Sequence, residues 1–525
     1  MANSRAPKDR KRRESLGSAL AQITLVAVML ALAVLVVYRR ANTHRQLSEV
    51  MREARAKALN GNTADLRGAL ALVDRALKLD PNAPDANAFG AAVWLDLWLD
   101  HREPGAQAKA TELLERATKA GAHGEERFGV EAQLRLQTGD AAGVVSFVEG
   151  LRRKGGSGAR LFLAEAQAFK AQGNLALARA ALLAAMDKAY RDGNYACALG
   201  DELLEEGAVG AIDTFGRAVQ EHPGLLRAQL GLALARLLKG ERLADAEAQV
   251  KEVLEHEATL SPPQHARALA VSAGLLEAQG RYADALTEAN LALSIDAKEV
   301  WAMLFRARAL AATADEGASE AFTTLVNTSP ASPLFYFEGA ARLQRSGKTD
   351  AAMGLLGRYE GFFQGVKSPT SDGKELPFLD RDDRYWLARG DLLKSSSHLD
   401  EAMSAYQKAI DAKGANLTKA VFAKAGLLLA QGQTDAAGQL LADITPPDGT
   451  GLAEAYLAMG EVQFAKKEWG PGCQSFAFGL TRLRDSHAPS TRLSEVYLDV
   501  DRRLKVANQR DLARLWLEEA KPLTR

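Results

Sequence analysis

Apolar residues recur along most of this chain with the three- and four-residue spacing of amphipathic helices, and these helices fall into pairs. The second helix of each pair opens on a small residue, usually followed four positions later by a bulky apolar residue and seven later by a small or apolar one. Thirteen positions fit: Ala69, Ala110, Ala141, Ala178, Ala211, Ala246, Ala285, Ala318, Ala352, Ala402, Ala437, Gly472 and Ala513. Their spacing clusters in the mid-thirties. Such a period predicts stacked helical hairpins, because one pair cannot bury its own apolar face.

The turn and second helix of these pairs resemble the tetratricopeptide repeat. In residues 280–292, Gly280 ends the first helix, Tyr282 packs into the hairpin and Ala285 lets the two backbones approach. Two more copies match at their aromatic, glycine and alanine positions: Trp386, Gly390, Ala402, Tyr406 and Ala409 in one, and Tyr456, Gly460, Trp469 and Phe476 in the other. The resemblance covers residues from about 45 to 520. It implies an all-α solenoid of about 12–13 degenerate hairpins that binds proteins or peptides.

Charge argues against one class of partner. The chain has 525 residues, of which 66 are basic and 66 acidic, so its formal net charge is zero. A nucleic-acid-binding surface needs a surplus of Lys and Arg against the phosphates. Charges of both signs are instead interspersed, as on solvated helix faces, so we expect no nucleic-acid partner.

A different pattern opens the chain. No charged residue occurs from position 15 to position 38, and residues 25–37 are almost purely aliphatic. Those 24 residues would form a helix roughly 36 Å long, enough for a hydrocarbon core of about 30 Å. We therefore expect a basic tail at 1–16 and a transmembrane helix at 17–38. Residues 41–59 contain no Pro or Gly, so the helix is expected to continue as a stalk.

The alternative for this segment is a cleaved signal peptide. Its apolar region should be about 7–15 residues long and end at small residues, whereas Arg39 and Arg40 follow the span here. Six basic residues flank each side, so counting does not fix the orientation. A short, densely basic tail is harder to translocate than a long domain. We therefore expect the N-terminus inside and, in a bacterium, a single-pass inner (cytoplasmic) membrane protein with a periplasmic array.

The longest interval, between Ala352 and Ala402, contains a turn-rich segment at 361–383. It carries three phenylalanines, Phe362, Phe363 and Phe378, that we expect to modulate partner binding. The segment could be a loop over the groove or a joint between two sub-arrays, and stacking is not expected to require it. The predicted organisation is about nine repeats at 39–360, an insertion loop at 361–383, and about four repeats with C-terminal capping helices at 384–525. No sheet is expected.

The sequence carries no complete catalytic motif. Gly347-Lys348-Thr349 ends like a phosphate-binding loop, but the glycine required five residues earlier is replaced by Arg342. The eight histidines lack the spacing that places two zinc ligands on one helix face. We therefore expect no catalytic residues, no cofactor, no small-molecule substrate and no enzyme activity.

Two further groups of residues could in principle bind a metal ion. Asp380, Asp382 and Asp383 are interrupted by arginines and are typical of a helix start, where acidic groups favour the helix dipole. Cys197 and Cys473 are far apart and lack a Cys-x-x-Cys pattern, so both are expected to be buried free thiols. No metal site is expected.

A binding function remains. In the family that the chain resembles, first helices line a concave groove that holds an extended peptide or a partner helix. One site of that family clamps a terminal carboxylate with Lys and Asn, but the matching positions here are Leu387, Asp391, Leu457 and Glu461. We expect a membrane-anchored scaffold of an envelope machine for secretion, motility, pilus assembly or polysaccharide export. The alternatives are a membrane-linked chaperone or quality-control adaptor for unfolded clients, and an enzyme subunit without a recognisable motif.

Overall fold

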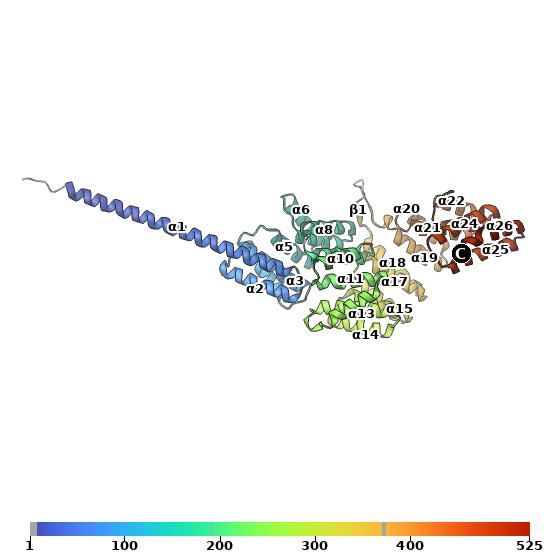
Figure 1. Ribbon diagram of the computed structural model, residues 1–525, viewed down its shortest axis with the longest axis horizontal. Coiled ribbons are helices and arrows are strands. Elements are labelled where there is room, and N and C mark those ends of the chain that lie inside the picture. The colour runs from blue at the N-terminus through green and yellow to red at the C-terminus, as the bar shows by residue number, and fades with distance from the viewer. Residues whose placement is uncertain (1–7, 191, 370–373, 525) are drawn as a thin grey trace, which may run out of the picture.

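The computed structural model describes residues 8–190, 192–369 and 374–524, with side chains from Thr24 to Leu523. Within these ranges lie 26 α-helices and one pair of short strands (Figure 1). Helices consecutive in sequence pack as hairpins, and the hairpins stack in chain order. The protein is therefore an all-α solenoid preceded by one apolar N-terminal helix, as the sequence predicts.

Thirteen helices are the first of a hairpin. They are α1 (Lys8–Ala58), α3 (Pro84–Leu99), α5 (Glu125–Gln137), α7 (Ala159–Ala171), α9 (Gly193–Glu206), α11 (Leu226–Lys239), α13 (Pro262–Ala278), α15 (Val300–Ala312), α17 (Pro333–Arg345), α19 (Asp383–Ser395), α21 (Leu417–Ala430), α23 (Ala453–Ala465) and α25 (Ser490–Val506). Three of them, α3, α13 and α17, begin with proline, which lacks only a donor that a first helical turn leaves unused.

The other thirteen are second helices. They are α2 (Thr63–Leu79), α4 (Ala106–Lys119), α6 (Ala141–Arg152), α8 (Leu175–Lys188), α10 (Ala211–Glu221), α12 (Leu243–Leu254), α14 (Tyr282–Ile295), α16 (Ala318–Thr328), α18 (Thr349–Phe363), α20 (Leu399–Asp411), α22 (Thr434–Ala442), α24 (Trp469–Asp485) and α26 (Arg510–Ala520). Each carries one of the thirteen small residues picked out by the sequence period. All of these residues are buried except Ala141, which is half-buried.

The turns between paired helices share a geometry. Near the end of the first helix, one residue adopts the left-handed backbone conformation that favours glycine, as Gly280 does with φ of 75°. Ser397 and Asn508 take this conformation in two other hairpins. Some second helices are also capped by side chains: Asn62 and Asn174 accept a hydrogen bond from the backbone N–H three residues later.

The insertion at 361–383 differs from the predicted loop. Residues 361–363 end α18, strand β1 (Lys367–Pro369) pairs antiparallel with β2 (Glu375–Pro377), and a 3-10 turn, η2 (Leu379–Arg381), leads into α19. The expectation of no sheet is wrong for this segment, because its two short extended pieces satisfy each other's backbone groups across a hairpin. Two other 3-10 turns, η1 (Glu257–Thr259) and η3 (Lys521–Thr524), flank helices.

The largest hydrophobic core crosses the insertion without a break. It runs from Ala166 to Leu427 and includes Phe363 before the hairpin and Tyr385 after it. The Tyr359 ring lies 4.6 Å from that of Phe363 and 5.6 Å from that of Tyr385, between centroids. Phe363 and Phe378, near the two ends of the insertion, are therefore packed into or against this core, and the expectation that stacking does not require the insertion stays a prediction.

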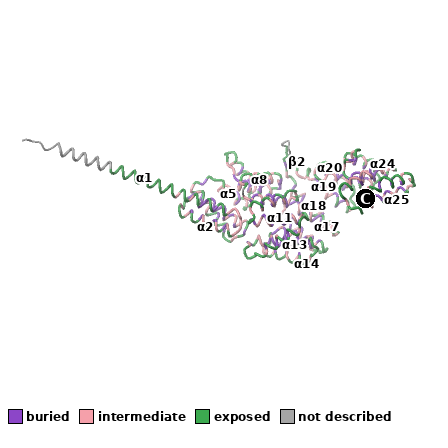
Figure 2. Tube along the Cα trace, in the orientation of Figure 1, coloured by how far each residue is buried: buried purple, intermediate pink, exposed green. Residues whose placement is uncertain are grey.

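Helix α1 joins the apolar segment to the array without interruption. It has 51 residues and is about 76 Å long. Its described N-terminal part stands clear of the array with exposed side chains, whereas Val50, Met51 and Ala54 are buried (Figures 1 and 2). Within the described residues it contains one candidate membrane span, at Thr24–Ala58, by length and composition alone; a signal sequence passes the same test. Residues 1–7 of the expected tail, and side chains up to residue 23, lie outside the described part.

The array curls so that distant hairpins touch. Helix α17 lies against α9, where Ser332 donates a hydrogen bond to Glu205. In a second closure, His101 in the α3–α4 turn reaches the start of α13, with Nδ1 2.9 Å from Ser261 Oγ. Its Nε2 lies 2.9 Å from the carbonyl oxygen of Gly61, in the α1–α2 turn. The first two hairpins are thereby held beside the seventh.

Candidate functional site

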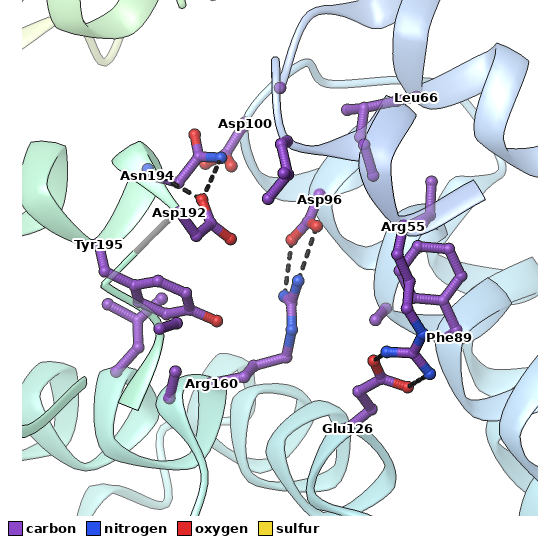
Figure 3. Close-up of a pocket in the computed structure, with 18 of the residues that line it drawn as sticks. Arg55, Leu66, Phe89, Asp96, Asp100, Glu126, Arg160, Asp192, Asn194 and Tyr195 are labelled. Atoms are coloured by element: carbon purple, nitrogen blue, oxygen red, sulfur yellow. Dashed lines mark hydrogen bonds and ion pairs between the residues drawn. The ribbon is translucent and has the colours of Figure 1, made fainter. Parts of the chain in front are cut away.

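The curl encloses a polar cavity, here called the inner cavity (Figure 3). It has two adjoining parts of about 310 and 250 Å³ that share Gly61, Asp100, Asn194 and Arg227. The ends of α1 and α3 form one wall. The N-terminal ends of α5, α7, α9, α11, α13 and α15 contribute to the facing wall. The cavity is therefore built mainly from first helices, with Leu66 and Lys188 added from second helices, on the side where a solenoid of this kind is concave.

Ion pairs tie first helices together in the larger part. The Arg160 guanidinium of α7 binds the Asp96 carboxylate of α3 through two hydrogen bonds, of 2.6 and 2.7 Å. Arg55 of α1 binds Glu126 of α5 in the same two-pronged manner (Figure 3). Each pair skips one hairpin, so the pairs fix the curvature of the array as well as the polarity of its wall.

A second chain of charges continues along the smaller part. Arg227 of α11 donates to Asp201 of α9 at 2.7 Å, and Arg267 of α13 donates to Glu299 at 2.8 Å. Arg267 Nη1 also lies 3.7 Å from Asp201 Oδ1, which has no hydrogen-bond partner within the described residues. Acidic and basic groups thus alternate from α9 to the start of α15.

Burial shifts the pKa values of several of these groups. It raises the pKa of the Asp96 carboxyl, against the opposing effect of Arg160. It likewise raises the pKa of Glu299, opposed by Arg267, and that of the Tyr195 hydroxyl. Each carboxylate is already committed to a guanidinium. Asp96 and Glu299 therefore act as fixed hydrogen-bonding groups in the wall of the cavity.

The groups left for a ligand are few and of mixed character. The Tyr195 ring, the Asn194 amide and the Asp100 carboxylate all border the open space (Figure 3). Asn194 Nδ2 donates to Asp192 at 2.9 Å. Among the described residues, no three His, Cys, Asp or Glu side chains come together in a way that could hold a metal ion.

The phenylalanines predicted to modulate binding lie elsewhere. Phe362, Phe363 and Phe378 pack together, with centroids 5.0 Å apart for the first two and 4.7 Å for the last two. Their rings lie on the turn between α7 and α8, where a β-carbon on Gly173 would be 3.2 Å from Phe362. They therefore cover the array's own fourth hairpin, and their influence on a partner stays a prediction.

The sequence did not reveal the inner cavity because most of its residues come from eight different first helices. A clue was nonetheless present: Asp96 interrupts an almost entirely apolar helix, and Glu299, only 6% exposed, precedes another. Charged groups at such positions need partners, since an unpaired buried charge is costly. The positions compared with the family's carboxylate clamp bind within the array instead, as Asp391 does to the Tyr406 hydroxyl at 2.7 Å.

Of the two free thiols, Cys197 is fully buried and Cys473 is half-buried. The loop-like Gly347-Lys348-Thr349 is a hairpin turn, in which Lys348 Nζ donates to the carbonyl oxygen of Asp315 at 2.5 Å. Neither feature belongs to the inner cavity.

The fold and its concave cavity define a helical-repeat solenoid of tetratricopeptide-like hairpins. No protein-family model matches the chain, and no curated protein matches it. Among solved structures, a human IFIT1 dimer with PPP-AAAA is 14% identical, with a TM-score of 0.43 over 76% of this chain and 94% of that one. A human IFIT1 dimer with m7Gppp-AAAA is 13% identical, with a TM-score of 0.44 over 75% and 89%. Likenesses of this size carry no argument about function.

Proposed function

We propose that the protein is a membrane-anchored scaffold that binds partner polypeptides in the inner cavity. The observation that carries this proposal is the cavity itself, a concave space lined with fixed polar groups. Its two parts, of about 310 and 250 Å³, lie near the lower end of ligand-pocket volumes, roughly 300–1,000 Å³. That is room for a few residues of an extended chain. Peptide N–H and C=O groups would find acceptors and donors at Asp100, Asn194 and Tyr195.

The anchor is the apolar part of α1. With the N-terminus inside, the array lies on the outer side of the inner membrane, and its partners are components of an envelope machine. A binding role rather than an enzymatic one is supported by Asp96, Glu126 and Glu299, whose carboxylates are engaged by arginines. A chaperone for unfolded clients would need a broad exposed apolar surface, whereas many charged side chains line the inner cavity.

Site-specific photo-crosslinking in intact cells tests this proposal. A crosslinking amino acid is placed at Leu163 or Lys188, which line the inner cavity. Matched controls carry it at Leu183 or Lys251, which are exposed on second helices away from the cavity. We expect a small number of discrete adducts at the cavity positions and none at the controls.

Three results would contradict the proposal. Adducts of equal yield at the four positions would mean that the cavity is not the binding surface. Adducts with many different proteins at the cavity positions would favour the chaperone function instead. The absence of any adduct at cavity positions, with normal amounts of membrane-bound protein, would remove the role of the cavity.

A further inference from the structure

We propose that a second cavity, where the insertion meets the fourth and fifth hairpins, binds an acidic side chain of a partner polypeptide. The cavity, of about 450 Å³, lies between α8, the end of α9, strand β1 and the α20–α21 turn. It is called the hairpin cavity below. The proposal rests on the proposed function in one respect, namely that the ligand is a polypeptide.

Cationic side chains outnumber carboxylates two to one around this cavity. The four cations are Arg179, Arg381, Arg384 and Lys413, and the two carboxylates are Glu206 and Asp382. Both carboxylates are already engaged. Glu206 forms an ion pair with Arg179, and Asp382 accepts from the Tyr359 hydroxyl and from a backbone N–H of α19.

Three of the cations have no carboxylate of their own. Arg381 Nη1 donates to the carbonyl oxygen of Pro369 at 3.3 Å. Arg384 Nη1 donates to the carbonyl oxygen of Glu206 at 2.8 Å, and its guanidinium lies 4.3 Å from the Phe337 ring centroid. Lys413 is exposed in the turn. Within the described ranges, no ion pair involves Arg381, Arg384 or Lys413, so positive charge is in excess.

Buried donors without acceptors point into the same place. Ser368, on β1, lines the cavity and is only 7% exposed, yet its hydroxyl has no hydrogen-bond partner among the described residues. The Nε atom of Arg179, which also lines the cavity, is buried and unpartnered among the described residues as well, although the rest of that side chain is partly exposed. A buried donor without an acceptor is destabilising, so a ligand that supplies the acceptor is favoured. An oxyanion is the ligand that would accept from a hydroxyl and from guanidinium N–H groups together.

A buried acceptor, on Glu206, favours a polypeptide as the source of the oxyanion. Oε1 of Glu206 is buried and also lacks a donor in the described part of the chain. Inorganic phosphate near neutral pH can offer that oxygen only a P–OH group and has no N–H donor. A polypeptide carries backbone N–H groups beside its carboxylates, so an acidic segment can satisfy Glu206 and the arginines at once.

Binding of an oligoglutamate peptide to the full chain in lipid nanodiscs, by calorimetry, tests this inference. Its glutamine counterpart and inorganic phosphate are the comparison ligands. The double variant Arg381→Gln/Lys413→Gln should weaken oligoglutamate binding about tenfold or more, because two charge-assisted contacts are lost. Arg306→Gln/Lys239→Gln removes the same charge from exposed positions outside the cavity and should leave binding unchanged.

Ser368→Ala separates binding from folding. Removing a buried hydroxyl that lacks a partner should leave the melting temperature unchanged or raise it. Affinity for oligoglutamate should nevertheless fall. Equal binding of the glutamine peptide, tighter binding of phosphate than of oligoglutamate, or unaltered affinity in both cavity variants would each overturn the inference. Crosslinking at the inner cavity would be unaffected by any of these results, so the two proposals can fail separately.

Discussion

The ring of Tyr406 lies so close to the backbone of Gly390 that a β-carbon on this glycine would be 2.5 Å from the ring atom Cε1. Gly390 is on α19 and Tyr406 on α20, so the contact brings the two helices of one hairpin together. A β-carbon at Gly460 would likewise lie 2.8 Å from Phe476, two hairpins later. The glycine and the aromatic residue of the repeat pattern are therefore one packing device, in which the ring occupies the space of the missing side chain.

Replacing this glycine should destabilise its hairpin. Gly390→Ala places a methyl group against the Tyr406 ring, and overpacking of this kind costs about 1–3 kcal/mol. Denaturant unfolding followed by circular dichroism would measure the loss. Gly216→Ala on α10 is the matched control, because a β-carbon there meets no atom within 4 Å. The control should be neutral or stabilising by about 0.5–1 kcal/mol, and an equal loss in both variants would refute the packing account.

Removal of the His101 side chain should loosen the curl. In its neutral form with a proton on Nε2, His101 donates to Gly61 and accepts from Ser261 at Nδ1, so His101→Ala leaves both partners unsatisfied. We expect faster amide hydrogen exchange in the α1–α2 turn and at the start of α13. The distance between spin labels on the second and seventh hairpins should also broaden. His398→Ala, at an exposed position, should change neither measurement, and unchanged exchange in the His101 variant would contradict the role of this contact.

The two thiols should differ from ordinary cysteines in their reaction with iodoacetamide. Burial raises the pKa of Cys197 to about 12 and that of Cys473 to about 11. Because the thiolate is the nucleophile, alkylation of the folded protein at pH 8 should be slow and should accelerate only as pH approaches these values. Unfolded chain, with thiol pKa values of about 8.5, should react quickly. Rapid labelling of Cys197 in folded protein at pH 8 would show that its surroundings open.

The anchor can be tested by removing it. Full-length protein should resist carbonate extraction from membranes, whereas a variant lacking residues 1–40 should be extracted and should keep its helical circular dichroism spectrum. The second result is expected because residues buried in the first hairpin, such as Val50 and Ala54, lie beyond the deletion. Recovery of a mature chain that begins near residue 41 would instead identify the segment as a cleaved signal sequence.

Local packing was predictable from the sequence. The small residues had to lie where second helices approach first ones, and Ala285, Ala402 and Gly472 do so with full burial. The interval between Ala69 and Ala110 exceeds the usual spacing, and the structure accounts for it with α3, of 16 residues, followed by a six-residue turn. Such features depend on neighbours within one hairpin, which the repeat period encodes directly.

The curl and its cavities were not predictable in the same way. His101 and Ser261 are 160 positions apart. A histidine or a serine in a turn between helices can equally well face solvent, so the sequence does not show that these two residues are in contact. The pairing of Asp96 with Arg160 likewise spans two hairpins, so it depends on the accumulated rotation of the stack rather than on any local pattern. The strands of the insertion are three residues each, too short for a period-two alternation to be recognised.

If the apolar part of α1 is the proposed membrane anchor, the unbroken course of this helix decides how the cavities face the membrane. A helix turns by about 100° and rises by about 1.5 Å with each residue, and α1 connects the span to the first hairpin without a flexible joint. Inserting a single residue between Arg40 and His44 would therefore swing the whole array about a third of a turn and aim its concave side at different neighbours. Four inserted residues would nearly restore the original heading and lift the array by about 6 Å. The number of residues in this stretch thus determines the direction in which the concave side of the array faces.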